Sequence, residues 1–302
     1  MKTKTRGAVQ MILAMTISGT VGWPVLVLGQ PPTTVVFWRC AFGALAMLAT
    51  CAALGQLKPG AINRRQLAVA TLGGIALVLN WTLLFAAYQH ASIAVATVTY
   101  HVQPFMLVAL GALLFGEKLT ANRLGWLLLA FAGMVLIVAG RQSGGSGDDY
   151  LLGVVLALGA ALMYAIAAAI VKRLAALPPQ LIVLIQLTVG TLALAPFAGL
   201  ATPPAAPIDW LLLATLGLVH TGLMSTLLYG AIQKIPTALV GALSFIYPAV
   251  AIVVDWAVFG AVFGHRLSLL QLLGTLAILG AAAGMNFGWR WTLAAHRAGK
   301  IG

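Results

Sequence analysis

Charged residues are scarce in this chain, and their scarcity excludes a soluble fold. Only 7% of the 302 residues are charged, while 62% are hydrophobic and the mean hydropathy is +1.03. A soluble domain carries roughly 25% charged residues, which keep its surface solvated. This chain has too few for such a surface, so we expect an integral membrane protein.

Acidic residues and cysteines are rarer still. Asp and Glu number five against 17 Lys and Arg, which gives a net charge of +12. In a soluble protein this charge would suggest nucleic acid as a partner, but most of the cations lie between apolar runs, where they orient helices. No nucleic-acid partner is therefore expected.

Cys40 and Cys51 fall about three turns apart in one predicted helix, which is beyond disulfide reach. We expect both to be packing residues, and we expect no metal site and no cofactor.

Motifs for catalysis and for ATP binding are also missing. No His is followed by Glu, as H-E-x-x-H would require, and Asp255 alone among the acids lies clearly within an apolar run. Paired membrane aspartates are therefore excluded, and no nucleophile with a base is recognisable. The lack of a Walker motif excludes a self-contained ATP-driven pump. We expect no catalytic residue and no enzyme activity.

Ten apolar segments make up most of the chain, each near the ~20 residues that span a bilayer. They are predicted at residues 7–28, 34–55, 66–88, 92–115, 121–140, 151–171, 181–200, 209–232, 236–260 and 268–288. The fold class is thus an all-α polytopic membrane protein. A Gly/Ser/Asp linker at 143–150 separates five segments in residues 1–142 from five in residues 151–302, which end in a basic tail.

The second five segments repeat the first five. Ala70-Thr71-Leu72-Gly73 returns as Ala214-Thr215-Leu216-Gly217, and Pro104 returns as Pro248, each 144 positions later. Gly7 begins a segment resembling the one at Gly153, so the first segment belongs to the repeat and is not read as a removed signal peptide. A fixed offset through apolar runs is expected of an internally duplicated transporter.

The distribution of Lys and Arg predicts the orientation of the segments. With the N-terminus inside, the termini and connecting stretches on the inner side of the membrane hold 14 of these residues, and the connecting stretches on the outer side hold only Arg141 and Arg266. Such a bias indicates that both termini are cytoplasmic. Because each group has five spans, the second enters the membrane upside down relative to the first, and the ten helices form two inverted repeats.

Several local sequences resemble one family. Phe37-Trp38-Arg39 in the second segment, and Pro104 with Gly116-Glu117-Lys118-Leu119 at the end of the fourth, resemble the drug/metabolite transporter superfamily of EamA type, most closely the YddG-type bacterial aromatic amino acid exporters. His265 stands where the second half of the family often has Glu. The resemblance implies a central cavity between two inverted five-helix repeats and export of amino acids across the bacterial inner membrane without ATP.

Polar and aromatic residues gather near the prolines inside the apolar runs. A proline within a span frees a carbonyl one turn back, and in lipid such a break survives where neighbours or water satisfy that group. We expect hinges at Pro24, Pro104 and Pro248. The predicted substrate-binding residues are Trp23, Asn80, Trp81, Tyr100, His101, Gln103, Tyr164, Ser244, Phe245 and Tyr247. Inverted symmetry places His101 and Gln103 opposite Phe245 and Tyr247.

Structural roles compete with these assignments. Tyr100 and Tyr247 could be core aromatics bonded to a freed carbonyl, and His101 could be an interhelical donor rather than a proton carrier. Trp23 and Trp81 could belong to an interfacial belt. Gln186 is interpreted as a helix–helix hydrogen bond, and Met224 as packing.

Two charges, Arg39 and Asp255, lie inside predicted spans. An isolated charge at such depth is costly, so each must reach water, a partner or the interface. Snorkelling or carbonyl bonding is the simpler interpretation for Arg39. Coupling or gating is the functional alternative for both, and the two could pair because both lie toward the outer face.

The expected function is export of aromatic or other neutral amino acids by alternating access. A carrier of other metabolites or drugs in the same superfamily is the alternative, and a channel or an intramembrane enzyme fits less well. The expected partners are the small-molecule substrate and membrane lipids. The sequence leaves the oligomeric state open, a monomer included, and the direction of transport rests on the resemblance alone.

Overall fold

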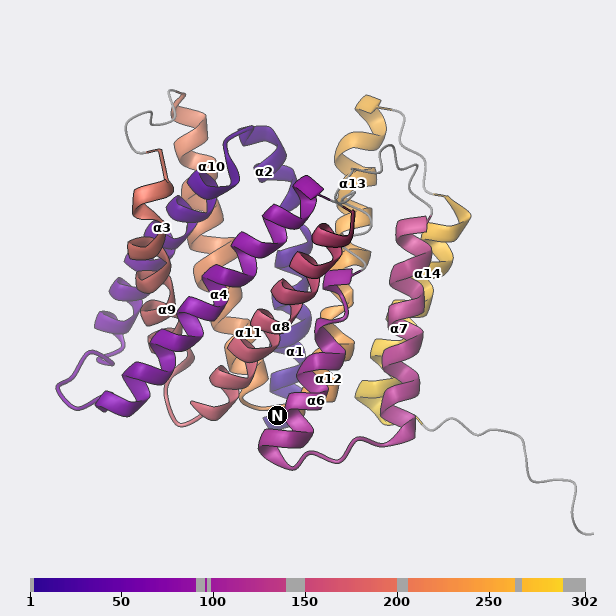
Figure 1. Cartoon of the computed structure of the whole chain (residues 1–302), viewed down its shortest axis with the longest axis horizontal. Coiled ribbons are helices and arrows are strands. Elements are labelled where there is room, and N and C mark those ends of the chain that lie inside the picture. The colour runs from indigo at the N-terminus through magenta and orange to yellow at the C-terminus, as the bar shows by residue number, and fades with distance from the viewer. Residues whose placement is uncertain are drawn as a thin grey trace, which may run out of the picture.

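Helices form all the regular structure that the computed structural model describes, which covers residues 3–90, 96, 99–139, 150–199, 206–263 and 268–289 (Figure 1). The elements are α1 (Thr3–Gly19), α2 (Gly22–Leu28), α3 (Pro32–Ala53), α4 (Arg64–His90), α6 (Gln103–Phe115), α7 (Ala121–Ala139), α8 (Tyr150–Arg173), α9 (Pro179–Leu194), η1 (Ala195–Phe197), α10 (Pro207–Gly217), η2 (Leu218–Leu223), α11 (Met224–Ile232), α12 (Thr237–Ser244), α13 (Ile246–Phe263) and α14 (Leu269–Phe287). Of the expected linker at 143–150, residues 143–149 lie outside the described residues, and Tyr150 is the first residue of α8.

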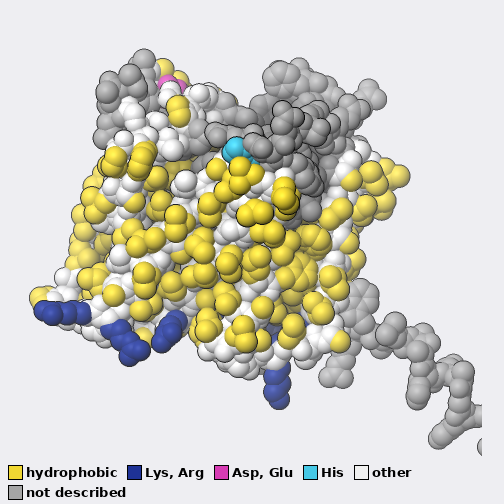
Figure 2. All heavy atoms as spheres, viewed as in Figure 1, with side chains coloured by type: hydrophobic (Ala, Val, Ile, Leu, Met, Phe, Trp, Pro, Cys, Tyr) yellow, Lys and Arg dark blue, Asp and Glu magenta, His cyan; other side chains and the backbone are white. Residues whose placement is uncertain are grey.

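The surface of the bundle is apolar, which confirms the prediction of a multi-pass membrane protein. Leu113, Leu192 and Leu276 are 80%, 71% and 66% exposed, and hydrophobic side chains cover the body of the molecule in Figure 2. Among the described residues, five spans are long and apolar enough to cross a bilayer, and four shorter apolar helices accompany them. Water would make such a surface costly, whereas lipid does not.

Basic side chains gather at one end of this apolar body. In Figure 2 the visible Lys and Arg side chains lie along the lower edge, the edge nearer the N-terminus in Figure 1. We call this the basic end and define it by Lys58, Arg64, Lys118, Lys172 and Lys234. Arg39 is set apart from them, within α3.

The helices pair in a pattern that treats the two groups of five alike. The main contacts join α4 with α8, α1 with α11, α3 with α9, α7 with α14, and α6 with α12. The third span (α4) packs against the sixth (α8), and its counterpart in the second group, the eighth span (α11), packs in the same way against the first (α1). Each of the other three pairs joins a span to its own counterpart. The halves therefore interlock through equivalent surfaces instead of packing as separate bundles.

Three spans that the sequence presents as continuous are interrupted close before a proline. The first span breaks at 20–21 before Pro24, and the ninth breaks at Phe245 before Pro248. The described helix of the fourth span, α6, begins only at Gln103, next to Pro104. Proline lacks the N–H that would bond the carbonyl four residues earlier, so each helix is interrupted there and restarts one or two residues before the proline. The predicted apolar ranges 7–28, 92–115 and 236–260 therefore each contain a break next to a proline.

The eighth span contains an interruption that no proline causes. Between α10 and α11 the chain forms a π-helical turn over Leu218–Leu223, inside the apolar span Pro207–Ile232 that agrees with the predicted segment 209–232. Gly217, just before this turn, lies so close to α3 that an added Cβ would be 2.4 Å from the Cβ of Phe42. Single π turns inside α-helices are frequent at functional sites.

Candidate functional site

Aromatic rings from the two groups of helices meet at the proline breaks. The ring of His101, just before α6, is parallel to that of Tyr247 in α13, with an interplanar angle of 14° and centroids 6.1 Å apart. The same imidazole lies 6.1 Å from the ring of Phe245, where α12 gives way to α13. The predicted approach of His101 to Phe245 and Tyr247 is therefore confirmed.

Half of the predicted substrate-binding residues are buried inside the protein. The exposed fractions are 1% for Asn80, 4% for His101, 7% for Gln103, 7% for Ser244 and 0% for Phe245. His101 and Gln103 are therefore enclosed in this conformation, and their role in binding substrate stays a prediction. Access to them requires the surrounding helices to move.

The side-chain donors of Asn80 and Ser244 are used inside the protein, whereas Asn80 Oδ1 is buried and has no hydrogen-bond partner among the described residues. Asn80 Nδ2 donates to the carbonyl of Ala160 at 2.8 Å and to the hydroxyl of Tyr100 at 3.2 Å. The Ser244 hydroxyl donates to the carbonyl of Gly241 at 2.6 Å. Asn80 therefore ties α4 to α8, and both residues contribute first to packing.

Gln103 has an unused acceptor in the same region. Its Oε1 atom is buried and has no hydrogen-bond partner in the described part of the chain. A buried polar atom left unpaired costs about 1–3 kcal/mol. The carbonyl oxygen of Gln103 is thus available to a ligand donor beside the Pro104 break.

Three half-buried aromatic residues extend the cluster. Tyr100 and Tyr164 meet edge to face with centroids 6.4 Å apart, and Tyr100 also lies edge-on to His101 at 5.7 Å. Trp81 in α4 has the guanidinium of Arg39 over its ring, with Cζ 5.7 Å from the centroid. The predicted aromatic wall is thus present as two groups of rings, one around Tyr100 and one at Trp81.

The guanidinium of Arg39 is held inside the bundle and, in the part of the chain that the structure describes, bonds a hydroxyl and not a carbonyl. Arg39 Nε donates to Thr221 Oγ1 at 3.1 Å, and the Thr221 hydroxyl donates in turn to the carbonyl of Leu216 at 2.8 Å. Thr221 lies in the π turn, which therefore presents its oxygen to the cation. The expected snorkelling or carbonyl bond of Arg39 is corrected accordingly.

Two predicted residues cannot be placed by their side chains. Trp23 belongs to α2 and Asp255 to α13, but both side chains lie outside the described part of the structure. The role of Trp23 and the pairing of Arg39 with Asp255 remain predictions. Pro24, Pro104 and Pro248 are buried next to the helix breaks described above.

Sequence reasoning overlooked the polar residues of the π turn. His220 Nε2 and Thr20 Oγ1 share a hydrogen bond of 2.9 Å, which joins this turn to the break in the first span. A histidine within an apolar run was the available signal for it. Elsewhere the Tyr229 hydroxyl donates to Gln186 Oε1, which confirms Gln186 as a helix–helix bond, and Met224 packs against the core as predicted.

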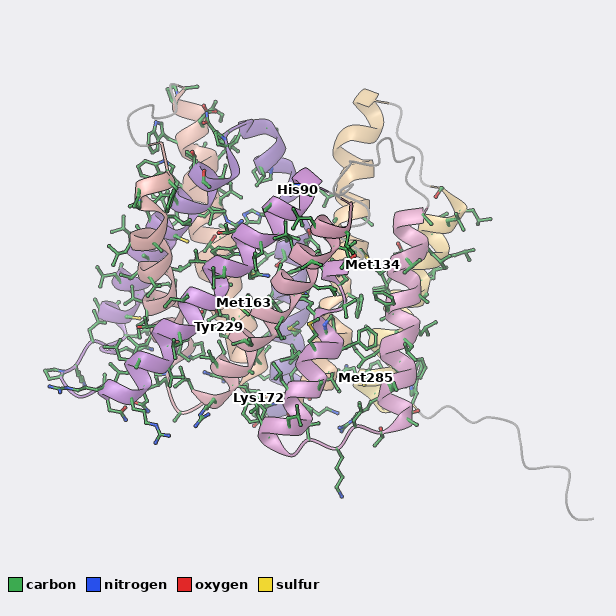
Figure 3. All side chains as sticks on the ribbon, viewed as in Figure 1. His90, Met134, Met163, Lys172, Tyr229 and Met285 are labelled. Carbon is green, nitrogen blue, oxygen red and sulfur yellow. The ribbon has the colours of Figure 1, made fainter. Side chains whose placement is uncertain are left out.

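A second polar cluster lies at the basic end and joins the two groups of helices. Glu117 Oε1 is 2.6 Å from Lys172 Nζ. Glu117 Oε2 accepts hydrogen bonds from the backbone N–H of Thr237 at 2.9 Å and from its hydroxyl at 2.8 Å. Thr237 is the first residue of α12, so this carboxylate caps the positive end of that helix. We call Glu117, Lys172 and Thr237 the Glu117 cluster, and Figure 3 shows Lys172 near the lower edge, below Tyr229.

Two glycines allow the Glu117 cluster to form. Gly116 ends α6 with a φ of +64°, a conformation that favours glycine, and so turns the chain toward α12. At Gly111 an added Cβ would lie 2.2 Å from Thr237 Oγ1. The helices can approach this closely only because Gly111 has no side chain.

The partners of Glu117 keep its carboxyl ionised. Burial alone would raise the pKa of Glu117, but hydrogen bonds from Lys172 and Thr237 and the positive charge of Lys172 outweigh it and hold the pKa below its ordinary value. Lys172 Nζ also donates to the carbonyl of Ile235 at 3.0 Å. The ion pair is therefore anchored on the loop that precedes α12.

A cavity of about 360 Å³ adjoins this cluster. Its lining residues are Glu117, Lys118, Arg123, Lys172, Gln233, Lys234, Ile235 and Pro236. Lys234 Nζ donates to Gln10 Oε1 at 3.1 Å and to the carbonyl of Gly230 at 2.7 Å. Burial and the neighbouring charge of Arg6 lower the pKa of Lys234. The cavity thus collects positive charge at the basic end.

A family comparison matches both groups of helices. The model of the EamA-like transporter family fits residues 5–139 and again residues 151–287. The chain belongs to the EamA-like transporter family. The paired helix contacts and the three proline breaks thus lie within the two matched segments. The protein is a multi-pass membrane transporter of this family.

Relatives extend over nearly the whole EamA chain. The transporter YxxF of Bacillus subtilis (strain 168), described as uncharacterized, is 29% identical over 289 residues, which are 93% of this chain and 90% of the relative. An uncharacterized transporter of Archaeoglobus fulgidus is 26% identical and covers 94% of this chain and 96% of its own. A solved crystal structure aligns with a TM-score of 0.81 at 20% identity, covering 94% of this chain and 97% of that one. That structure shows the shared fold alone.

Proposed function

We propose that this EamA-family transporter exports neutral amino acids, aromatic or large aliphatic, from the bacterial cytoplasm across the inner membrane. The observation that carries the proposal is the meeting of His101, Phe245 and Tyr247 at the proline breaks of the fourth and ninth spans. A flat apolar side chain would stack among these rings and bury apolar area at about 25 cal/mol per Å². The unpaired Oε1 of Gln103 supplies an acceptor for the substrate ammonium.

Alternating access without ATP is the proposed mechanism. Ten spans in two inverted halves would exchange roles as the transporter opens to one side and then to the other. The helix pairing, in which each contact maps onto an equivalent one, supports this arrangement. Broken helices beside Pro24, Pro104 and Pro248 are suited to absorb the movement, because their backbone bonds are already interrupted.

The basic end is proposed to be the cytoplasmic face, with both termini there. The gathering of Lys and Arg at this end supports that orientation. The Glu117 cluster would then close the cytoplasmic entrance in the conformation described, since Glu117 belongs to the first half and Lys172 and Thr237 to the second. Opening to the cytoplasm would require this ion pair to separate.

Exchange in proteoliposomes tests the proposed substrate. Purified protein is reconstituted in vesicles loaded with unlabelled amino acid, and uptake of labelled phenylalanine, leucine, aspartate and lysine is compared with protein-free vesicles. We expect phenylalanine and leucine to exchange faster than aspartate or lysine, because nothing in the cluster of rings would neutralise a second side-chain charge. Equal rates for all four substrates would contradict the proposal.

Two substitutions connect this activity to the proposed site. Gln103→Ala removes the free acceptor and Tyr247→Ala removes the ring that stacks on His101. Each should lower exchange of phenylalanine without preventing insertion in the membrane. Leu113→Ala is a matched control, because that side chain is 80% exposed on the outer surface of α6. If both site variants transport as well as the control, the site is misassigned.

A further inference from the structure

Arg39 is a cation inside the bundle whose hydrogen-bonding capacity is mostly unused. A guanidinium carries five N–H donors, and in the described part of the chain one of them, on Nε, has a partner, the neutral oxygen of Thr221. No carboxylate of the described residues lies within ion-pair distance of Arg39; the described acid–base pair is Glu117 with Lys172. Among the described residues this charge has no counter-ion, and a charge at this depth is costly and marks a functional position.

The surroundings of Arg39 hold its guanidinium in place rather than neutralise it. The ring of Trp81 covers one face of the guanidinium, 5.7 Å from Cζ, and Thr221 fixes the Nε edge at 3.1 Å. Thr221 accepts from Arg39 and donates its own proton to the carbonyl of Leu216, so it brings a neutral oxygen and no negative charge to the guanidinium. The Nη side is left as a planar fork of donors. Such a fork matches the two oxygens of a carboxylate.

Arg39 is also close to the aromatic cluster of the proposed substrate site. The residue is half-buried, so part of its side chain remains accessible. Trp81, one of the predicted site residues, lies against its guanidinium, with Cζ 5.7 Å from the ring centroid. The other described Lys and Arg residues belong to the ends of helices or to loops. Arg39 is thus the described cation that contacts a ring of the predicted site within the bundle.

We propose that Arg39 binds the carboxylate of the transported solute through its Nη fork, with Trp81 and Thr221 holding the guanidinium in position. This inference rests on the proposed function and deepens it, since it makes a carboxylate an obligatory feature of the substrate. Solutes that lack a carboxylate, such as simple aryl amines, would be poor substrates even where their rings fit.

Ligand-induced thermal stabilisation of the detergent-purified protein tests the inference separately from transport. The probes are L-phenylalanine, 3-phenylpropionate, which keeps the carboxylate and lacks the ammonium, and L-phenylalaninamide, which keeps the ammonium and lacks the carboxylate. We expect 3-phenylpropionate and phenylalanine to stabilise the protein and phenylalaninamide to bind at least about 10-fold more weakly, since a charge-assisted hydrogen-bonded pair is lost. Equal binding of phenylalaninamide and phenylalanine would overturn the inference.

Substitutions locate the effect at Arg39. Arg39→Gln should weaken binding of 3-phenylpropionate about 10-fold or more, and Arg39→Lys should recover part of it, because a lysine keeps the charge but not the fork. Arg65→Gln is the matched control, since Arg65 is exposed at the basic end. A folded Arg39→Gln protein that binds 3-phenylpropionate as tightly as the control would refute the inference.

The two proposals fail in different ways. If wild-type protein binds 3-phenylpropionate through Arg39 but exchanges no amino acid, the carboxylate site stands and amino acid export is wrong. If phenylalanine is exchanged while phenylalaninamide is exchanged equally well, export stands and the role of Arg39 is wrong. Should Arg39→Gln not fold, the comparison of the three probes on the wild type still decides the matter.

Discussion

Replacing Glu117 by Gln should open the basic end of this transporter. The amide keeps the shape of the side chain but loses the charge that attracts Lys172 Nζ at 2.6 Å and strengthens the two bonds from Thr237. A hydrogen bond to a charged group contributes about 1.5–3 kcal/mol. Because Lys172 and Glu117 are 17% and 18% exposed, solvent screening favours the lower part of that range, and we take about 2 kcal/mol. Since about 1.4 kcal/mol is tenfold, the population open at this end should rise about 30-fold.

Cysteine labelling measures that opening. Ile235 lines the cavity beside the Glu117 cluster and is only 2% exposed, so Ile235→Cys should react slowly while the cluster is closed. The native Cys40 and Cys51 are replaced by Ala, and an impermeant maleimide is added from the side of the basic end. With Glu117→Gln, the labelling rate should rise by up to about 30-fold, the ratio that corresponds to a loss of about 2 kcal/mol. A cooperative melting curve in detergent separates opening from unfolding.

The control and the pH dependence sharpen this test. Asp209→Asn makes the same chemical change in the first turn of α10 and should leave labelling unaltered. Because the pKa of Glu117 lies below its ordinary value in the closed state, closure is stabilised above the ordinary pKa and is lost as pH falls through the depressed one. After division by the labelling rate of a free cysteine standard at each pH, which corrects for the thiolate fraction, labelling of the parent protein should therefore be flat from about pH 6 to about pH 8 and rise only in acid. Equal labelling of Glu117→Gln and the Asp209→Asn control would show that the carboxylate does not hold this end closed.

Three further predictions concern the hinges, the packing and the topology. Pro104→Ala and Pro248→Ala restore an N–H and should slow exchange while the proteins stay folded, so normal transport rates in both would remove the hinge interpretation. Gly111→Ala would place a Cβ 2.2 Å from Thr237 Oγ1 and should lower the melting temperature through about 1–3 kcal/mol of overpacking, whereas an unchanged melting curve would mean that these helices have room to separate. A cysteine at Ser146, which lies outside the described residues, should react with an impermeant reagent in intact spheroplasts, and labelling only after lysis would contradict the proposed orientation.

Much of the helical architecture could be predicted, because hydropathy acts along the chain. Length and apolarity of a run determine whether it suits a bilayer, and these are local properties. The helix breaks before Pro24 and Pro248 were also foreseeable, since the missing N–H of a proline acts within one turn. The meeting of His101 with Tyr247 followed from the internal repeat, which relates positions far apart by symmetry.

The π turn at Leu218–Leu223 could not be predicted from local sequence. It contains no proline, and its residues Val219, His220 and Thr221 would fit an ordinary helix. Its stability depends on contacts from other helices, including the hydrogen bonds of Thr20 with His220 and of Arg39 with Thr221. Interactions between distant segments decide such a distortion.

The amino-acid sequence alone determined that this protein lies in a membrane, that its halves are duplicates and where prolines break its helices, because hydropathy, repetition and proline act over short stretches of chain. Tertiary packing determined which polar groups meet. Glu117 and Thr237 are 120 positions apart, and Arg39 and Thr221 are 182 apart. Nothing in either local sequence specifies its partner. These pairs form because glycine contacts such as the one at Gly111 let helices from opposite halves approach closely. A buried charge can then bond only the few polar groups that this packing places beside it.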